Sequence, residues 1–161
     1  MKVYFTGKPQ NKKITKGMLA EAAKFYAKLL MSDKLVRKLQ VHIVFDQKLG
    51  TNIIGTSAAV VTALSDNYPR NFEIGISPKL GLKPTLRTLA HEMVHVEQSA
   101  TGRRYTYVRN DDLVRWEKDK FSEADNDYWS LPWEIEAHGK EAGLYAKYKA
   151  MIDDKRKRKT T

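Results

Sequence analysis

The stretch PTLRTLAHEMVHVEQSATG, residues 84–102, predicts more about fold and chemistry than any other part of this chain. Its apolar side chains recur at the spacing of a helix that buries one face. Pro84 suits the first turn of such a helix, and Gly102 suits its C-terminal stop. We therefore expect an amphipathic helix here, with its apolar face turned toward the core.

Inside this helix, residues 91–95 form the pattern His-Glu-x-x-His. Side chains four residues apart lie one turn apart on the same face, so His91 and His95 would be neighbours. Two imidazoles can hold a zinc ion, and Glu92 beside them is a candidate catalytic base for a metal-activated water. The expected cofactor is one Zn2+ ion. The alternative is a structural pair in the core, although burying these groups without partners would be costly.

Catalytic zinc commonly has three protein ligands, and the third is expected within SLPWEIEAHGKEAG, residues 130–143. Glu134 and Glu136 are two residues apart on a predicted helix, so they point about 200° from each other and only one should bind. Glu134 is favoured, because Ala137 would allow close helix packing and His138 lies one turn on, where it could support a ligand. Glu136 is the fallback and His138 the next alternative. Glu134 could instead serve only as a carboxylate at a helix N-terminus.

Other polar side chains are candidates for stabilising the transition state or supporting a ligand. Gln98 lies one turn beyond His95 and could orient a ligand or substrate, and the alternative is a solvated glutamine at the helix end. The candidates for holding an oxyanion are Tyr105, Tyr107, Tyr128 and His138.

The residues HEMVHVEQ, followed by PWEIEA at 132–137, resemble the zincin metallopeptidases, and among them the gluzincin-like group with a glutamate ligand. Over roughly residues 40–145 the chain looks similar to small SprT-like HExxH proteins of bacteriophages and bacteria. The resemblance implies a zincin-like fold, zinc, and hydrolysis of a protein or peptide substrate.

Residue by residue, the resemblance implies that His91 and His95 bind the metal, that Glu92 is the catalytic base and that Glu134 is the third ligand. The chain also departs from the family pattern. His138 stands where gluzincins often carry aspartate, and residues 96–110 lack the third histidine of SprT proteins proper.

The remaining patterns predict an α+β fold with an N-terminal helix, a small, mainly antiparallel sheet, the HExxH helix and a C-terminal helix carrying the third ligand. The 161 residues fit one domain, residues 1–161, with a flexible basic tail from about 154. In the first half we expect a helix over 15–31 capped by Thr15, a strand over 40–46, and a hairpin of strands 57–64 and 71–77. Residues 103–131 are expected to be irregular apart from a short strand near 105–108 or 113–116. The last expected element is a helix from Pro132 to about Asp153.

The chain is strongly basic, with a formal net charge of +10 and no cysteine. No apolar run reaches the length of a membrane span, and the N-terminus does not resemble a signal peptide, so the expected location is the cytoplasm, that of a host if the protein is phage-encoded. Basic clusters near both ends predict contact with DNA or RNA, although such clusters are also common as solvated tails. The alternative function is therefore a nucleic-acid-binding or phage accessory protein whose metal is structural.

Overall fold

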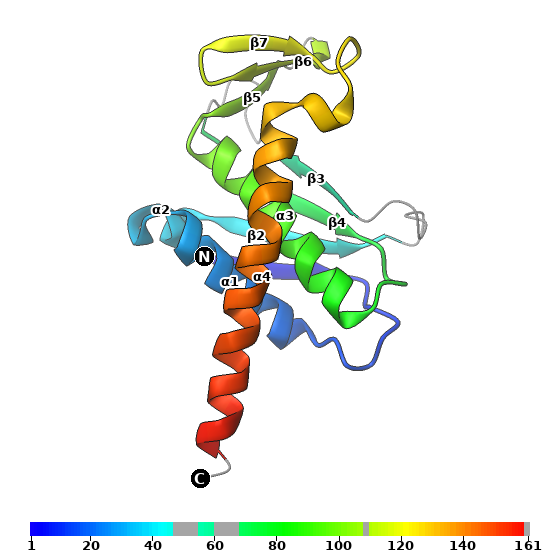
Figure 1. Cartoon of the computed structure of the whole chain (residues 1–161), viewed down its shortest axis with the longest axis vertical. Coiled ribbons are helices and arrows are strands. Elements are labelled where there is room, and N and C mark those ends of the chain that lie inside the picture. The colour runs from blue at the N-terminus through cyan, green and yellow to red at the C-terminus, as the bar shows by residue number, and fades with distance from the viewer. Residues whose placement is uncertain (47–54, 60–67, 108–109, 160–161) are drawn as a thin grey trace.

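The computed structural model describes residues 1–46, 55–59, 68–107 and 110–159, and within them it has the α+β class expected from the sequence (Figure 1). Four α-helices accompany two small sheets. The elements are β1 (Lys2–Thr6), α1 (Lys16–Leu30), α2 (Asp33–Lys38), β2 (Gln40–Phe45), β3 (Gly55–Ala59), β4 (Asn71–Ile76), α3 (Leu82–Ala100), β5 (Arg104–Tyr107), β6 (Asn110–Trp116), β7 (Asp119–Ser122), the 3-10 turn η1 (Tyr128–Ser130) and α4 (Pro132–Lys159).

The larger sheet has the strand order β1-β2-β4-β3, and the prediction of a mainly antiparallel sheet was wrong for it. Strand β1 pairs in parallel with β2, and β2 pairs in parallel with β4. For β1 and β2 the physical reason is their connection, which contains α1 and α2 and returns the chain to the same end of the sheet, as a parallel crossover requires.

The predicted hairpin is antiparallel where the structure describes it. Ala59 pairs with Phe72 and Gly55 with Ile76. Strand β3 begins before the predicted residue 57, and the rest of the predicted strand, from residue 60, lies outside the described residues. Within the described chain β3 forms one edge of the larger sheet.

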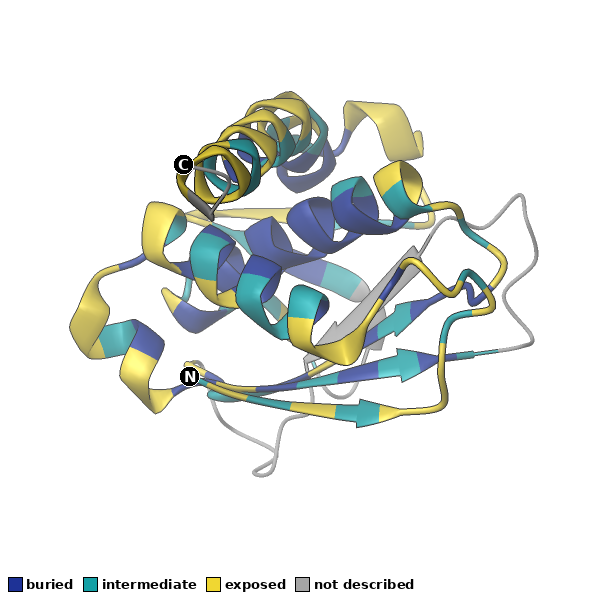
Figure 2. Ribbon diagram, turned by 90° about the horizontal axis from the view of Figure 1, so that it is seen from below, coloured by how far each residue is buried: buried dark blue, intermediate teal, exposed yellow. Residues whose placement is uncertain are grey.

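Helix α3 lies between the larger sheet and α4, and Figure 2 shows it as an almost continuously buried ribbon. As predicted, Pro84 falls in its first turn and Gly102 follows its end. Gly102 has φ +76°, and a Cβ there would lie 2.4 Å from the Tyr68 ring, so only glycine fits this stop. Because α3 is surrounded by protein, even its polar side chains must face other protein groups.

Helix α1 and its capping residue also follow the prediction. The Thr15 hydroxyl accepts a hydrogen bond from the backbone N–H of Met18 at 3.1 Å. Tyr148 of α4 packs over this helix and donates to the Met18 carbonyl at 3.1 Å, which ties the middle of α4 to α1.

The segment predicted to be largely irregular instead forms the sheet β5-β6-β7, which is antiparallel. Val114 of this sheet packs with Leu131 and Trp133, the residues on either side of the start of α4. This second, small core fixes where α4 begins. The helix then continues past the predicted end at Asp153 to Lys159, so the basic segment expected to be a tail is helical.

No helix in the described part of the chain combines the length and the apolar character needed to cross a bilayer.

Candidate metal centre

Helices α3 and α4 cross so that four acid or imidazole side chains become buried together. His91, Glu92 and His95 come from α3, and Glu134 comes from the first turn of α4. Each is less than one tenth exposed. Polar groups at such depth require partners, so their mutual arrangement decides what the centre can do.

The ring nitrogens of the two histidines converge on the Glu134 carboxylate. His91 Nε2 lies 3.3 Å from Glu134 Oε2, and His95 Nε2 lies 3.3 Å from Glu134 Oε1. The two Nε2 atoms are 3.1 Å apart. The three side chains therefore converge, with two nitrogens from one helix facing the two carboxylate oxygens of Glu134 from the other.

The far side of each imidazole is held by a hydrogen-bond acceptor. His91 Nδ1 lies 3.1 Å from Glu141 Oε2, and a carboxylate can only accept, so this nitrogen carries the hydrogen. His95 Nδ1 lies 2.8 Å from Gln98 Oε1. The amide nitrogen of Gln98 donates to the Trp133 carbonyl at 3.1 Å, which leaves its oxygen as the acceptor for His95.

These contacts dictate which protons a neutral pair of imidazoles carries. With Nδ1 of His91 and His95 both protonated, both Nε2 atoms present lone pairs toward each other and toward the Glu134 carboxylate. Three electron-rich atoms in one buried volume repel one another unless a cation lies among them. In the metal-free protein that cation can only be a proton; a divalent ion would satisfy all three at once.

The pKa shifts of His91 and Glu134 also indicate that this site favours positive charge. Burial lowers the pKa of His91, but the hydrogen bond to Glu134 and the charges of Glu92, Glu134 and Glu141 outweigh it and raise this pKa above its ordinary value. Burial alone would raise the pKa of Glu134, yet its contacts with His91 and His95 drive it well below the ordinary range. The carboxylate therefore stays charged and the site attracts positive charge.

Glu92 is buried beside this cluster, but within the described chain one of its carboxylate oxygens lacks the hydrogen-bond partners that the other three side chains have. Among the described residues, its Oε2 atom has no hydrogen-bond partner. A buried carboxylate oxygen without a donor is costly, which is typical of a group that acts on a bound molecule or water.

Tyr128, in η1, reaches the cluster from outside. Its hydroxyl donates to Glu134 Oε2 at 2.7 Å. Burial and the neighbouring Glu134 raise the pKa of Tyr128, so it keeps its proton and remains a donor at neutral pH. The other two candidate tyrosines, Tyr105 and Tyr107 of β5, contact each other at 5.2 Å between ring centroids, and their rings face Arg115 and Lys120 of the small sheet.

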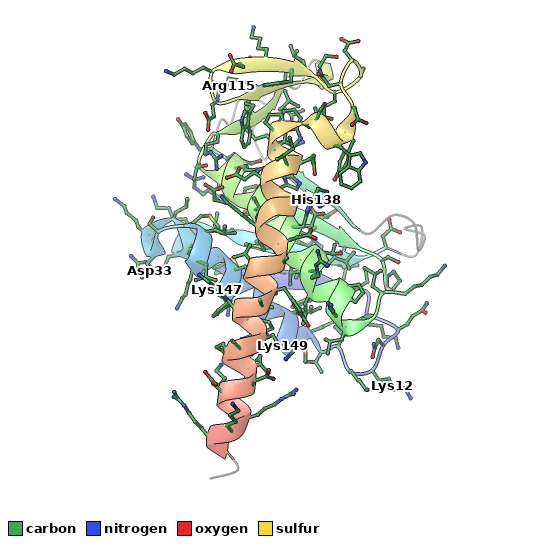
Figure 3. All side chains as sticks on the ribbon, viewed as in Figure 1. Lys12, Asp33, Arg115, His138, Lys147 and Lys149 are labelled. Carbon is green, nitrogen blue, oxygen red and sulfur yellow. The ribbon has the colours of Figure 1, made fainter. Side chains whose placement is uncertain are left out.

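His138 also lies at the edge of the cluster, on the upper part of α4 (Figure 3). Its ring centroid is 4.5 Å from that of His91. His91, Glu134 and His138 offer a second combination of ligand atoms, all within 4.8 Å of one another. The contacts among His91, His95 and Glu134, at 3.1–3.3 Å, are well inside that limit, so we regard that set as the first candidate for a metal site and His138 as its neighbour.

Glu136 lies on a different face of α4, as its spacing from Glu134 predicts. Its carboxylate accepts from both Arg103 Nη atoms, at 3.2 and 2.8 Å, and from Gln98 at 2.9 Å. Burial raises the pKa of Glu136, but these contacts and Lys140 outweigh it and hold the value at about 2. The structure thus brings Glu134 to the histidines and commits Glu136 to a guanidinium.

Two residues of this centre were missed in the sequence. Glu141 supports His91, and Arg87 of α3 pairs with Glu141. A signal for Glu141 was present, because it follows Glu134 by seven residues and so lies about two turns along the same face. Nothing local in the sequence indicated Arg87.

Comparisons of the chain with protein-family models, with curated proteins and with solved structures find no match.

Proposed function

We propose that this protein is a zinc-dependent hydrolase of peptide bonds. The observation that carries the proposal is the convergence of two imidazole Nε2 atoms and one carboxylate in a buried place, beside a carboxylate with an unpartnered oxygen. The zincin-like interpretation of the HExxH motif belongs to this proposal.

The residues fit the ion. A tetrahedral zinc site with bonds of about 2.0–2.1 Å separates its ligand atoms by about 3.3–3.4 Å. The two Nε2 atoms are 3.1 Å apart, and Glu134 presents one oxygen to each of them, Oε2 at 3.3 Å from His91 Nε2 and Oε1 at 3.3 Å from His95 Nε2. These three residues would hold the ion. Bound there, zinc would polarise a substrate carbonyl and make a water molecule acidic near neutral pH.

Glu92 is the proposed general base and acid. Its unpartnered Oε2 would accept the proton that the attacking water loses, and would then deliver it to the leaving amine nitrogen. The burial of Glu92 excludes bulk water, so this proton would pass between the reacting groups rather than to solvent.

Tyr128 is the candidate for stabilising the oxyanion. Its hydroxyl already donates at the edge of the cluster and keeps its proton, as a donor to developing negative charge must. In the described part of the chain, strand β3 is at the edge of the sheet beside α3, where an extended substrate could add its backbone as a further strand.

The test is the substitution Glu92→Gln in the full chain, with zinc content and hydrolysis of unfolded casein measured on the same samples. We expect the variant to keep stoichiometric zinc and to lose activity by at least about 100-fold. The control is Glu97→Gln, a buried glutamate of the same helix that pairs with Arg103 instead. Unchanged hydrolysis in Glu92→Gln, or a wild-type protein without zinc, would refute the proposal.

A second candidate function is binding of nucleic acid, with the metal holding only the fold. The observation in its favour is the number of basic side chains in the half of the molecule away from the small sheet, where Figure 3 labels Lys147 and Lys149 on α4 and Lys12 to one side of that helix. The helical segment of residues 155–158 adds four exposed basic side chains in the same half. Such a grouping attracts polyanions at low salt.

The two candidates are separated by a salt series. If binding to duplex or single-stranded DNA is the function, its affinity should fall steeply as salt rises, and Glu92→Gln should leave it unchanged. No affinity for DNA at low salt would remove the second candidate. Replacing residues 155–158 with alanine should reduce the dependence on salt if that segment makes the contacts.

A further inference from the structure

An exposed apolar surface adjoins the candidate metal centre. Trp129 and Ile135 are 67% and 56% exposed, the two highest values among the large apolar side chains that the structure describes. They lie in η1 and in the first turns of α4, on either side of Glu134 in the sequence. Exposed apolar side chains gathered at one place on a protein commonly mark a binding surface.

The Trp129 ring is held in place. It packs against His138 at 4.9 Å between centroids with an angle of 31° between the planes, and it meets the Tyr128 ring edge-on at 5.2 Å. Two neighbours thus fix the indole orientation while most of its surface stays in solvent. A tryptophan needed only for packing would gain stability from fuller burial, so this arrangement favours an external occupant.

A chain of ring contacts connects this surface to the centre. Trp129 contacts His138, and His138 contacts His91 at 4.5 Å between centroids. Ile135 lies three residues before His138 and therefore shares its face of α4. We call the surface formed by Trp129 and Ile135 the Trp129 patch. Through His138 and His91 it is connected to the place where the scissile bond would lie.

We propose that the Trp129 patch is a specificity site that takes a large apolar side chain of the peptide substrate, next to the bond that is cut. This inference rests on the proposed function, because it assigns a substrate class to the same centre. The indole would stack on an aromatic side chain or cover an aliphatic one, and Ile135 would add apolar contact. Substrates with small or charged side chains at that position would lose this contact.

The test uses two small zinc-binding probes on the zinc-loaded full chain, acetohydroxamic acid and 3-phenylpropanohydroxamic acid. They share the metal-binding group, and only the second carries a large apolar arm. Calorimetry gives the ratio of their dissociation constants, which cancels any effect of a variant on the metal itself. We expect the phenyl compound to bind at least about tenfold more tightly in the wild type.

In Trp129→Ala this ratio should fall to about threefold or less, and Trp129→Phe should recover much of it. Leu29→Ala is the matched control, because Leu29 is an exposed apolar residue of α1, and it should leave the ratio unchanged.

A wild-type ratio near one, or a ratio that Trp129→Ala leaves intact, would overturn the specificity site while hydroxamate binding itself still supported the hydrolase. Failure of both probes to bind protein that carries zinc would overturn the proposed function, and the specificity site with it.

Discussion

Glu134 and Glu136 stand two residues apart on α4, yet they lie in opposite electrostatic surroundings. Glu136 faces Arg103, a permanent cation that donates two hydrogen bonds to it. Glu134 faces two imidazoles whose other nitrogens already hold their hydrogens, and a tyrosine hydroxyl. One carboxylate is neutralised by the protein itself. The other contacts two imidazoles and a tyrosine hydroxyl, and under the proposed function a bound cation would neutralise it. This difference separates a structural ion pair from a candidate metal site.

The largest expected effect comes from removing each carboxylate in turn and comparing the zinc affinities of the two variants. Glu134→Ala should weaken zinc binding by more than about 100-fold, because it deletes the only anionic ligand and leaves two neutral nitrogens. Glu136→Ala should change zinc affinity by no more than about threefold. Competition with a chromogenic chelator measures both, and comparable losses in the two variants would contradict the assignment of Glu134 as the ligand.

The supporting residues should show an intermediate effect. Glu141→Ala removes the acceptor that fixes the His91 ring, so zinc affinity should fall by about 10–100-fold while the ligands remain. The matched variant is Asp153→Ala, which removes a carboxylate that pairs with Lys149 farther along the same helix. If Glu141→Ala bound zinc as tightly as that control, Glu141 would have no part in the centre.

Zinc affinity should also depend on pH with a definite sign. The pKa of His91 is raised in the metal-free protein, so below that pKa a proton occupies the site and zinc must displace it. Affinity should therefore be constant above this pKa and fall as pH decreases through it, by about tenfold per pH unit for each proton released. Calorimetry in buffers of different ionisation heat counts those protons. Affinity that stayed constant down to pH 5 would be inconsistent with imidazole ligands.

The smallest expected effect concerns the ion pair of Glu136 with Arg103. The pKa of Glu136 is about 2, below the ordinary value of 4.5. The ion pair therefore stabilises the fold fully above about pH 4.5, and this stabilisation disappears as pH falls toward 2. The wild type should exceed Glu136→Gln in free energy of unfolding by about 1 kcal/mol at pH 7, since the pair is partly exposed, and by almost nothing near pH 2. Urea unfolding at both pH values tests this, and an equal difference at both would refute the role of the charge.

The same region shows what local sequence can predict. The helical spacing of His91 and His95, and the opposite directions of Glu134 and Glu136, follow from helix geometry alone, and the structure has both. Gln98 was also placed correctly against His95, because a residue one turn away on the same helix needs no long-range contact. Their roles in metal binding remain predictions.

Contacts between distant segments were not predictable in this way. The pairing of Arg103 with Glu136, and of Arg87 with Glu141, depends on how α3 crosses α4. The parallel pairing of β1 with β2 involves a short strand that was not predicted, although Val3 and Phe5 alternate along it. In the region of the small sheet, one short strand was predicted but not a sheet, because polar and charged residues interrupt its strands. Its described apolar side chains pack with Leu131 and Trp133 at the start of α4, which is a contact between distant segments.

The most direct measurement is a crystal structure of the zinc-soaked full chain, with anomalous scattering recorded on both sides of the zinc absorption edge. The account predicts one strong anomalous peak at about 2.0–2.2 Å from His91 Nε2, His95 Nε2 and a Glu134 oxygen, with Glu136 still bound to Arg103. An ion bound elsewhere, or no peak between α3 and α4 in a crystal that holds zinc, would contradict it.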